Sequence, residues 1–267
     1  MTQGIALIGA PTDINSSFLR GPAKAPARIR AQLGSDHGNR ATESGFEIGM
    51  DIPLDDRGDL PLTEGAGDDA LIEQGVAAAL ADGAVPIILG GDHAITYPVM
   101  RAMAARYGPL NILHFDAHAD LYDELLGNRR SHASPFARIM EEGLASRLVQ
   151  VGIRTLNGHQ AKQAKRFGVE IVAMRDFAPD KVPVLSGPLY ISIDLDGLDP
   201  AFAPGVSHHE PGGLSVREVL NVLARQTAQL VGADVVELNP DRDINDMTAV
   251  VAAKFVKELV DMAARPA

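Results

Sequence analysis

Seven short, almost uninterrupted apolar runs restrict the fold more than any other feature of the sequence. They cover residues 5–9, 85–89, 110–115, 148–151, 170–173, 189–193 and 233–238. Continuous rather than alternating apolar runs of this length are typical of strands that are buried on both faces. Such strands occur in parallel sheets that carry helices on either side.

Helical patterns separate these runs. We expect helices over residues 23–33, 69–81, 97–106, 135–142, 159–167, 215–225 and 248–264. Ser215 followed by Glu218 has the spacing of a capping box and marks the start of the sixth helix. The alternation of strands and helices predicts an α/β fold with a mostly parallel sheet.

The chain of 267 residues is interpreted as a single domain over residues 1–267. Segments 34–65 and 202–213 are rich in Gly, Pro and polar residues, and we expect them to be long loops within that domain. No internal repeat or low-complexity stretch interrupts the pattern.

Composition excludes several kinds of partner. Lys and Arg number 24 against 35 Asp and Glu, and the net charge of −11 argues against a nucleic acid or an anionic membrane. The absence of Cys excludes disulfides, thiolate metal sites and a Cys nucleophile. No apolar run approaches the ~20 residues of a membrane span. We also see no signal peptide, so the expected location is cytoplasmic.

Acidic and histidine residues gather where four of the predicted strands end. The carboxyl ends of parallel strands meet at one edge of a sheet, and ligands bind there. The four segments are Gly90-Gly91-Asp92-His93, Asp116-Ala117-His118-Ala119-Asp120, Asp194-Leu195-Asp196-Gly197-Leu198-Asp199-Pro200 and Glu237-Leu238-Asn239-Pro240.

Alternate residues of an extended segment point to the same side, so the acidic and histidine side chains can converge. The predicted set of metal ligands is His93, Asp116, His118, Asp120, Asp194 and Asp196. Buried carboxylates this close repel one another, whereas two divalent ions balance the charge of four carboxylates. Oxygen and imidazole ligands suit Mn²⁺, and Zn²⁺, Fe²⁺, Co²⁺ or Ni²⁺ could also bind them. Two such ions ~3.5–4 Å apart share a water and make it hydroxide near neutral pH.

Simpler interpretations of the single motifs fit the sequence less well. A calcium loop at Asp194-Leu195-Asp196-Gly197 is disfavoured because its Gly stands at the fourth place rather than the sixth. A phosphate turn at Gly90-Gly91 lacks the Lys-Ser/Thr that would follow it. His114 is interpreted as a hydrogen-bonded core residue, and His37 and His159 as surface residues.

The strand-end segments resemble the three signatures of the ureohydrolase family of arginases and agmatinases. The resembling residues are 90–93, 116–120 and 192–200, preceded by Gly9-Ala10-Pro11-Thr12-Asp13. Within that family, segments 128–134, 204–213 and 241–243 look like the corresponding segments of plant-type arginases. Many agmatinases and animal arginases have Thr-Gly-Thr-Pro at the position of Val206-Ser207-His208-His209. Plant-type members look like organelle enzymes with transit peptides, and the lack of such an extension here favours a bacterial, cytoplasmic relative.

The resemblance implies a three-layer α-β-α fold around a mostly parallel sheet of roughly eight strands, and two Mn²⁺ ions. It places the first ion on His93, Asp116, Asp120 and Asp194. It places the second on Asp116, His118, Asp194 and Asp196. It also implies a small guanidino substrate and a homo-oligomer, either a trimer or a hexamer. Phe255, Leu259 and Met262 on the last helix are interpreted as core rather than interface.

Catalytic roles follow from the same resemblance. His132 matches a proton-shuttle histidine, Glu237 matches a carboxylate that grips the guanidinium, and Asp120 can pass a proton to the departing amine. From the residues alone, His132 could equally be an ordinary loop histidine and Glu237 the partner of Arg242.

The implied reaction is hydrolysis of L-arginine to L-ornithine and urea, with agmatine to putrescine and urea as the alternative. More remote alternatives are another guanidino or formimino hydrolase, a metal-dependent phosphoesterase and a non-catalytic family member. Arginine differs from agmatine by its α-carboxylate, so selectivity needs donors at the mouth of the pocket. The predicted donors are Asn128 and Ser131, with His208 and His209 also available. Arg129 and Arg130 are interpreted as solvated charges.

Overall fold

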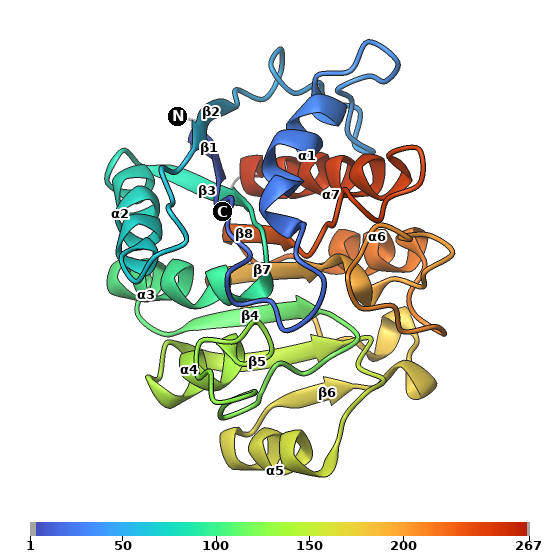
Figure 1. Cartoon of the computed structure of the whole chain (residues 1–267). Coiled ribbons are helices and arrows are strands. Elements are labelled where there is room, and N and C mark those ends of the chain that lie inside the picture. The colour runs from blue at the N-terminus through green and yellow to red at the C-terminus, as the bar shows by residue number, and fades with distance from the viewer. Residues whose placement is uncertain (1–3, 266–267) are drawn as a thin grey trace.

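A computed structural model describes residues 4–265. Its centre is an eight-stranded sheet in the order β2-β1-β3-β8-β7-β4-β5-β6 (Figure 1). Every neighbouring pair of strands is parallel. The strands are β1 (Gly4–Gly9), β2 (Asp55–Asp59), β3 (Ala84–Leu89), β4 (Leu110–Phe115), β5 (Ala145–Val151), β6 (Glu170–Val172), β7 (Leu189–Asp194) and β8 (Leu230–Val236).

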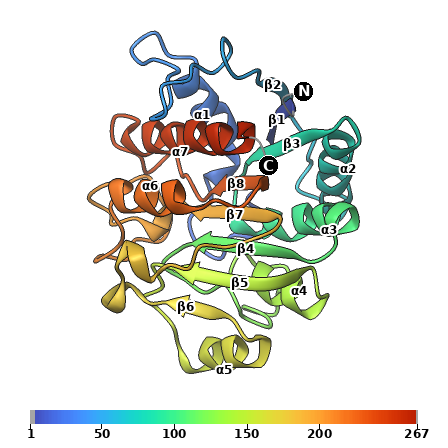
Figure 2. The same ribbon diagram turned by 180° about the vertical axis from the view of Figure 1, so that it is seen from behind.

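Seven α-helices of the described residues cover the two faces of the sheet (Figures 1 and 2). They are α1 (Ala25–Leu33), α2 (Asp68–Ala81), α3 (Thr96–Tyr107), α4 (Pro135–Glu141), α5 (Gly158–Phe167), α6 (Val216–Arg225) and α7 (Met247–Ala264). Helices α1, α6 and α7 share one hydrophobic core with the sheet, and α2, α3 and α4 share the other. The predicted three-layer α-β-α architecture is confirmed.

Local sequence explains why these elements form where they do. All residues of β3, β7 and β8 are buried, as continuous apolar runs require. The capping box of α6 is present, because Ser215 Oγ accepts from Glu218 N (3.2 Å) and the Glu218 carboxylate accepts from Ser215 N (2.8 Å). Phe255, Leu259 and Met262 lie in the core, as expected.

Most element ends differ from the expectation by one to three residues, and two differences are of another kind. Segment 34–65 is not entirely loop, because β2 (Asp55–Asp59) pairs with β1 at the edge of the sheet. Its sequence is polar and mostly exposed, so backbone pairing holds it rather than apolar burial. Strand β8 spans Leu230–Val236 instead of 233–238, and it ends before Glu237, whose φ of 65° lies in the left-handed region. Among the helices of residues 4–265, none combines the length and the apolar character needed to cross a bilayer.

Candidate metal centre

Four neighbouring strands at the centre of the sheet carry the candidate site. The strands β3, β8, β7 and β4 lie side by side in that order, and each is followed by one of the acidic or histidine segments. Their carboxyl ends therefore bring residues from four distant parts of the chain to one edge of the sheet.

Two glycines let these segments approach closely. A Cβ added at Gly91 would lie 1.8 Å from the carbonyl oxygen of Thr12, and one added at Gly197 would lie 2.9 Å from the backbone nitrogen of Asp116. Side chains at either position would push the segments apart. Gly91 and Gly197 thus allow the close backbone contacts that hold the acidic and histidine side chains near one another.

His93 directs one ring nitrogen at three carboxylates. Its Nδ1 lies 3.3 Å from Asp116 Oδ2, 3.2 Å from Asp120 Oδ2 and 3.1 Å from Asp194 Oδ2. The His93 ring is fully buried, and this nitrogen has no hydrogen bond of acceptable geometry. An imidazole nitrogen surrounded by carboxylate oxygens is an arrangement that a cation completes.

A buried hydroxyl fixes the tautomer of His93. Ser192 Oγ donates its hydrogen to Asp234 Oδ1 (2.6 Å), so it accepts from His93 Nε2–H (2.9 Å). Asp234 Oδ2 also accepts from Tyr190 (2.7 Å) and Thr96 (2.8 Å). This network leaves the lone pair of His93 Nδ1 for a metal ion, as is typical of histidine ligands.

A second group of donors lies beside the first. His118 Nδ1 is 3.4 Å from Asp116 Oδ1 and 3.2 Å from Asp196 Oδ2. The two oxygens of Asp116 thus point to different histidines, Oδ2 to His93 and Oδ1 to His118. Asp194 and Asp196 are connected directly, because Asp194 Oδ1 accepts from Asp196 N at 2.8 Å.

His114 is buried and hydrogen-bonded, as predicted, and its partner is Asp116. Gln150 Nε2 donates to His114 Nδ1 (3.1 Å), so Nε2–H of His114 donates to Asp116 Oδ2 (2.9 Å). His114 is close enough to His93 and Asp116 to share a metal ion with them. Its Nε2 carries a hydrogen, however, so His114 orients Asp116 rather than ligating.

The pKa shifts reflect crowded negative charge. Burial and its carboxylate neighbours raise the pKa of Asp194 well above its usual value, and burial raises that of Asp196 to about 6. Burial would also raise the pKa of Asp116, yet the hydrogen bond from His114 and the close imidazoles of His118 and His93 hold it well below its usual value. Within residues 4–265, no Lys or Arg pairs with Asp116, Asp120, Asp194 or Asp196. The donor set, rich in oxygen and imidazole, therefore fits two divalent ions.

A cavity of about 220 Å³ opens beside these ligands. It is bordered by His118, Asp120, Asp194 and Asp196, and also by His132. His132 is held at both nitrogens, by Ser17 Oγ on Nε2 (2.8 Å) and by Glu237 Oε1 on Nδ1 (2.8 Å). Burial lowers the pKa of His132, but the charge and the hydrogen bond of Glu237 outweigh it and raise the pKa to about 9.

Glu237 lies beneath His132 and is almost fully buried. Besides His132, its Oε1 accepts from the backbone nitrogen of His93 at 2.9 Å. Among the described residues it forms no ion pair with Arg242, so that alternative is set aside. A guanidinium that reaches Glu237 must share it with His132 or displace the ring.

The two predicted carboxylate donors lie away from the cavity wall. The amide of Asn128 is engaged with Asn15 Oδ1 (3.1 Å) and Arg130 N (2.8 Å), and Ser131 is buried. Arg129 is a paired, exposed charge, as expected. Arg130 is instead held by Asp69 and stacks over a tyrosine ring, so it is not a solvated charge.

His208 borders the cavity, whereas His209 turns to the carbonyl of Pro204. The ring of His208 lies 5.1 Å from that of His132 and 6.0 Å from that of His118. Other lining residues that sequence reasoning missed are Ser17, Tyr122, Leu125, Thr155, Gln160 and Glu210. The signal for Ser17 was available, since it follows the carboxyl end of β1 at the same edge of the sheet.

The sequence pattern of the Arginase family matches residues 3–261. The chain belongs to the arginase family. It is 52% identical to "Arginase 1, mitochondrial" and 51% to "Arginase 2, chloroplastic/mitochondrial", both of Arabidopsis thaliana, over 95% of this chain and 79% of each relative. The solved arginase of Medicago truncatula has a TM-score of 0.93 at 43% identity, over 99% of this chain and 88% of that one.

These comparisons correct one prediction. The cytoplasmic location expected from the sequence is contradicted, because the Arabidopsis relatives carry the names mitochondrial and chloroplastic/mitochondrial, which point to an organelle. The resemblance to plant-type arginases is confirmed by the same relatives.

Removal of metal should make stability fall as pH rises. The pKa of Asp196 is raised to about 6 and that of Asp92, through burial and Glu237, to about 7. The folded, metal-free protein therefore binds more protons than the unfolded chain between about pH 4 and 7, and its stability decreases across that window. Thermal melts of chelated protein at pH 5 and pH 7 should show a lower Tm at pH 7, and Mn²⁺ should abolish the difference. A higher Tm at pH 7 after chelation would contradict the crowded-carboxylate account.

Proposed function

We propose that this protein hydrolyses L-arginine to L-ornithine and urea at a centre of two divalent ions, most naturally Mn²⁺, within a single domain over residues 1–267. The buried Nδ1 of His93 facing three carboxylate oxygens carries the proposal. Relatives with about half of their residues identical are named arginases, which supports arginine rather than agmatine as substrate.

The ligand set divides between two ions in this proposal. His93, Asp116, Asp120 and Asp194 would hold one ion, and Asp116, His118, Asp194 and Asp196 the other, so that Asp116 and Asp194 bridge. When bound, the ions supply a water of lowered pKa as the nucleophile for the guanidinium carbon. The protein contributes orientation, since His114 donates a hydrogen bond to Asp116 and His93 donates one to Ser192, and both bonds fix the ligands.

Charge directs the substrate into the cavity. A guanidinium is planar and cationic, and the cavity is bordered by Asp120, Asp194 and Asp196. Glu237 would anchor the guanidinium from beneath His132. Asn128 and Ser131 are the proposed partners of the α-carboxylate, although neither borders the cavity in this structure. His132 already forms an ion pair with Glu237, so arrival of a second cation would free its ring to carry protons.

Proton transfer falls to Asp120 and His132. Asp120 borders the cavity, only 5% exposed, and would pass a proton to the departing amine nitrogen. His132 would relay protons between the site and solvent, with Ser17 Oγ on its Nε2 as the first acceptor toward the cavity.

A panel of substrates tests the proposal. Urea release by Mn²⁺-loaded protein should be fastest with L-arginine and slower with agmatine, 4-guanidinobutyrate and guanidine. A generic phosphate ester should not be hydrolysed. Faster turnover of agmatine would overturn the substrate assignment, and no urea from any guanidine would overturn the proposed function.

Replacing His132 with asparagine should lower kcat about 10²-fold. Asparagine keeps a donor for Glu237 but cannot carry a proton, so metal content should match that of the parent protein. Urea assays across pH and metal analysis check this, with exposed His37→Asn as the control. An unaltered pH–rate profile in His132→Asn would remove the shuttle role.

We also propose that the protein is a homo-oligomer, a trimer or a hexamer. Apolar side chains near the start of α7 support this, because Ile244, Met247 and Val250 are 55%, 46% and 52% exposed. Light scattering on the purified protein tests the assignment, and a monomer at micromolar concentration would refute it.

A further inference from the structure

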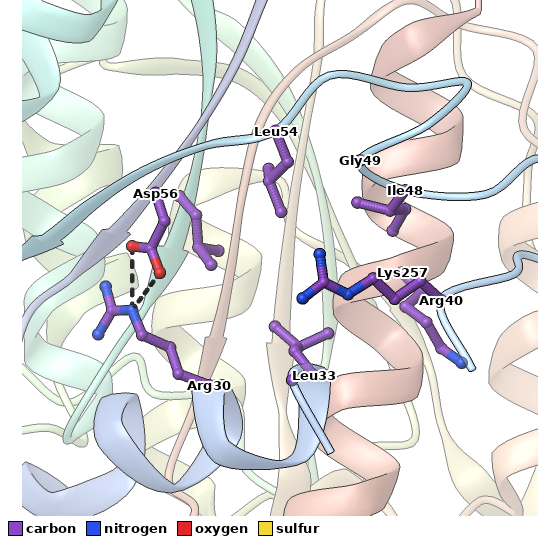
Figure 3. Close-up of a pocket in the computed structure, with 10 residues that line it drawn as sticks. Arg30, Leu33, Arg40, Ile48, Gly49, Leu54, Asp56 and Lys257 are labelled. Atoms are coloured by element: carbon purple, nitrogen blue, oxygen red, sulfur yellow. Dashed lines mark hydrogen bonds and ion pairs between the residues drawn. The ribbon is translucent and has the colours of Figure 1, made fainter. Parts of the chain in front are cut away.

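A second pocket lies between α1, α7 and the segment that leads to β2 (Figure 3). Its volume is about 180 Å³, and none of its lining residues borders the cavity at the metal centre. Leu33, Ile48 and Leu54 form apolar walls. Arg30, Arg40 and Lys257 add three cations to a chain whose net charge is −11.

One of the three cations is already neutralised. Arg30 Nε donates to both oxygens of Asp56 (3.0 and 2.9 Å), and its guanidinium also pairs with Asp59 and donates to the carbonyl of Gly58 (2.9 Å). The Arg30–Asp56 side of the pocket therefore offers no free positive charge.

The other two cations lack an acidic partner. Among residues 4–265, the guanidinium of Arg40 forms no ion pair or side-chain hydrogen bond, and it reaches into the space between Leu33 and Leu54 (Figure 3). Lys257 Nζ donates to the carbonyl of Asn39 (3.1 Å), and it has no ion pair within the described part of the chain. Burial and the nearby charge of Lys254 lower the pKa of Lys257, as expected of a lysine without a counter-charge.

Backbone geometry keeps Arg40 in place. Ile48 N donates to the carbonyl of Arg40 (3.1 Å). A Cβ added at Gly49, whose φ is +93°, would lie 3.3 Å from Arg40 Nη1, so glycine leaves room for the guanidinium beside the backbone. Arg40 is an exposed residue whose guanidinium lies along the pocket wall, within reach of both solvent and a bound ligand.

We propose that this pocket binds a small aliphatic carboxylate. Its carboxylate would accept paired hydrogen bonds from the guanidinium of Arg40, and Lys257 would add a second positive charge at the wall of the pocket. Its hydrocarbon chain would pack against Leu33, Ile48 and Leu54. A volume of about 180 Å³ equals roughly six waters of liquid, which suits a compact ligand of metabolite size.

Calorimetry with 4-methylpentanoate as the probe tests the proposal on Mn²⁺-loaded protein. We expect saturable binding that weakens as salt is raised, no saturation with the neutral 4-methylpentanamide, and weaker binding of acetate, which lacks the apolar chain. Equal binding of the amide would overturn the role of the cations, and equal binding of acetate would overturn that of the apolar walls.

Variants locate the probe. Arg40→Gln and Lys257→Gln should each weaken binding about tenfold or more. Lys254→Gln is the matched control, because Lys254 lies on the same helix but pairs with Glu258 outside the pocket. Asp196→Ala tests whether the probe binds the metal ions instead. This variant should bind 4-methylpentanoate with the affinity of the parent protein. Unaltered affinity in Arg40→Gln, or its loss in Asp196→Ala, would place the probe elsewhere. Neither result depends on urea release, so this site and the proposed function fail separately.

Discussion

Replacing Asp196 with alanine is expected to lower urea release by at least about 100-fold. Asp196 Oδ2 lies 3.2 Å from His118 Nδ1, and the residue is 5% exposed. In the proposed two-ion centre its loss would leave the second ion without one carboxylate, so metal analysis should show reduced binding. Urea assays and metal content measured on the same sample check both consequences.

Folding of this variant separates a metal defect from a structural one. Without metal, Asp196 is one of several buried carboxylates that repel one another, and burial raises its pKa to about 6. Removing it should leave the metal-free protein at least as stable as the metal-free parent near pH 7. The exposed Asp36→Ala serves as the control. Full activity with both metals retained in Asp196→Ala would rule out the two-ion centre.

Replacing Gly91 with alanine should destabilise the protein by about 3 kcal/mol or more. The new Cβ would lie 1.8 Å from the carbonyl oxygen of Thr12, which is backbone and cannot rotate away. Relief requires movement of the segment that carries His93, so metal affinity should fall as well. Denaturant melts with and without Mn²⁺ measure both effects.

Gly67→Ala is the matched control for this prediction. A Cβ at Gly67 meets no heavy atom within 4 Å, and the backbone φ of −86° suits alanine. Its stability should stay within about 0.5 kcal/mol of the parent protein. If Gly91→Ala were as stable as Gly67→Ala, the close approach of the two segments would be wrong.

The pattern of apolar residues predicted most of the fold, because buried strands and the helices between them leave signals within short stretches of sequence. The runs over 85–89 and 189–193 match β3 and β7 closely, since every residue of those strands is buried. The same signal missed β2, which is polar, exposed and held by backbone hydrogen bonds to β1. An edge strand of this kind leaves no apolar trace in the sequence.

The ligand cluster was predictable for a related reason. Alternate residues share a side of an extended segment, and parallel strands end at one edge, so spacing alone brings Asp116 and His118 together with residues after β3 and β7. The pocket around them was not predictable in this way. Asn128 and Ser131 are near His132 in the sequence, but their side chains do not border the cavity, whereas His208 and Ser17 do.

The sequence by itself determined the chemistry of the proposed centre, because the kinds of proposed ligand and their spacing lie in three short segments. Only the tertiary structure decided how His132 is held, between Ser17 and Glu237, which are 115 and 105 residues away along the chain. It also decided that Arg40 and Lys257 line one pocket and that, within residues 4–265, neither forms an ion pair with a carboxylate. Contacts of this kind form between loops that are distant in the sequence and pack together only in the folded protein. The local periodicity of the sequence therefore does not predict them.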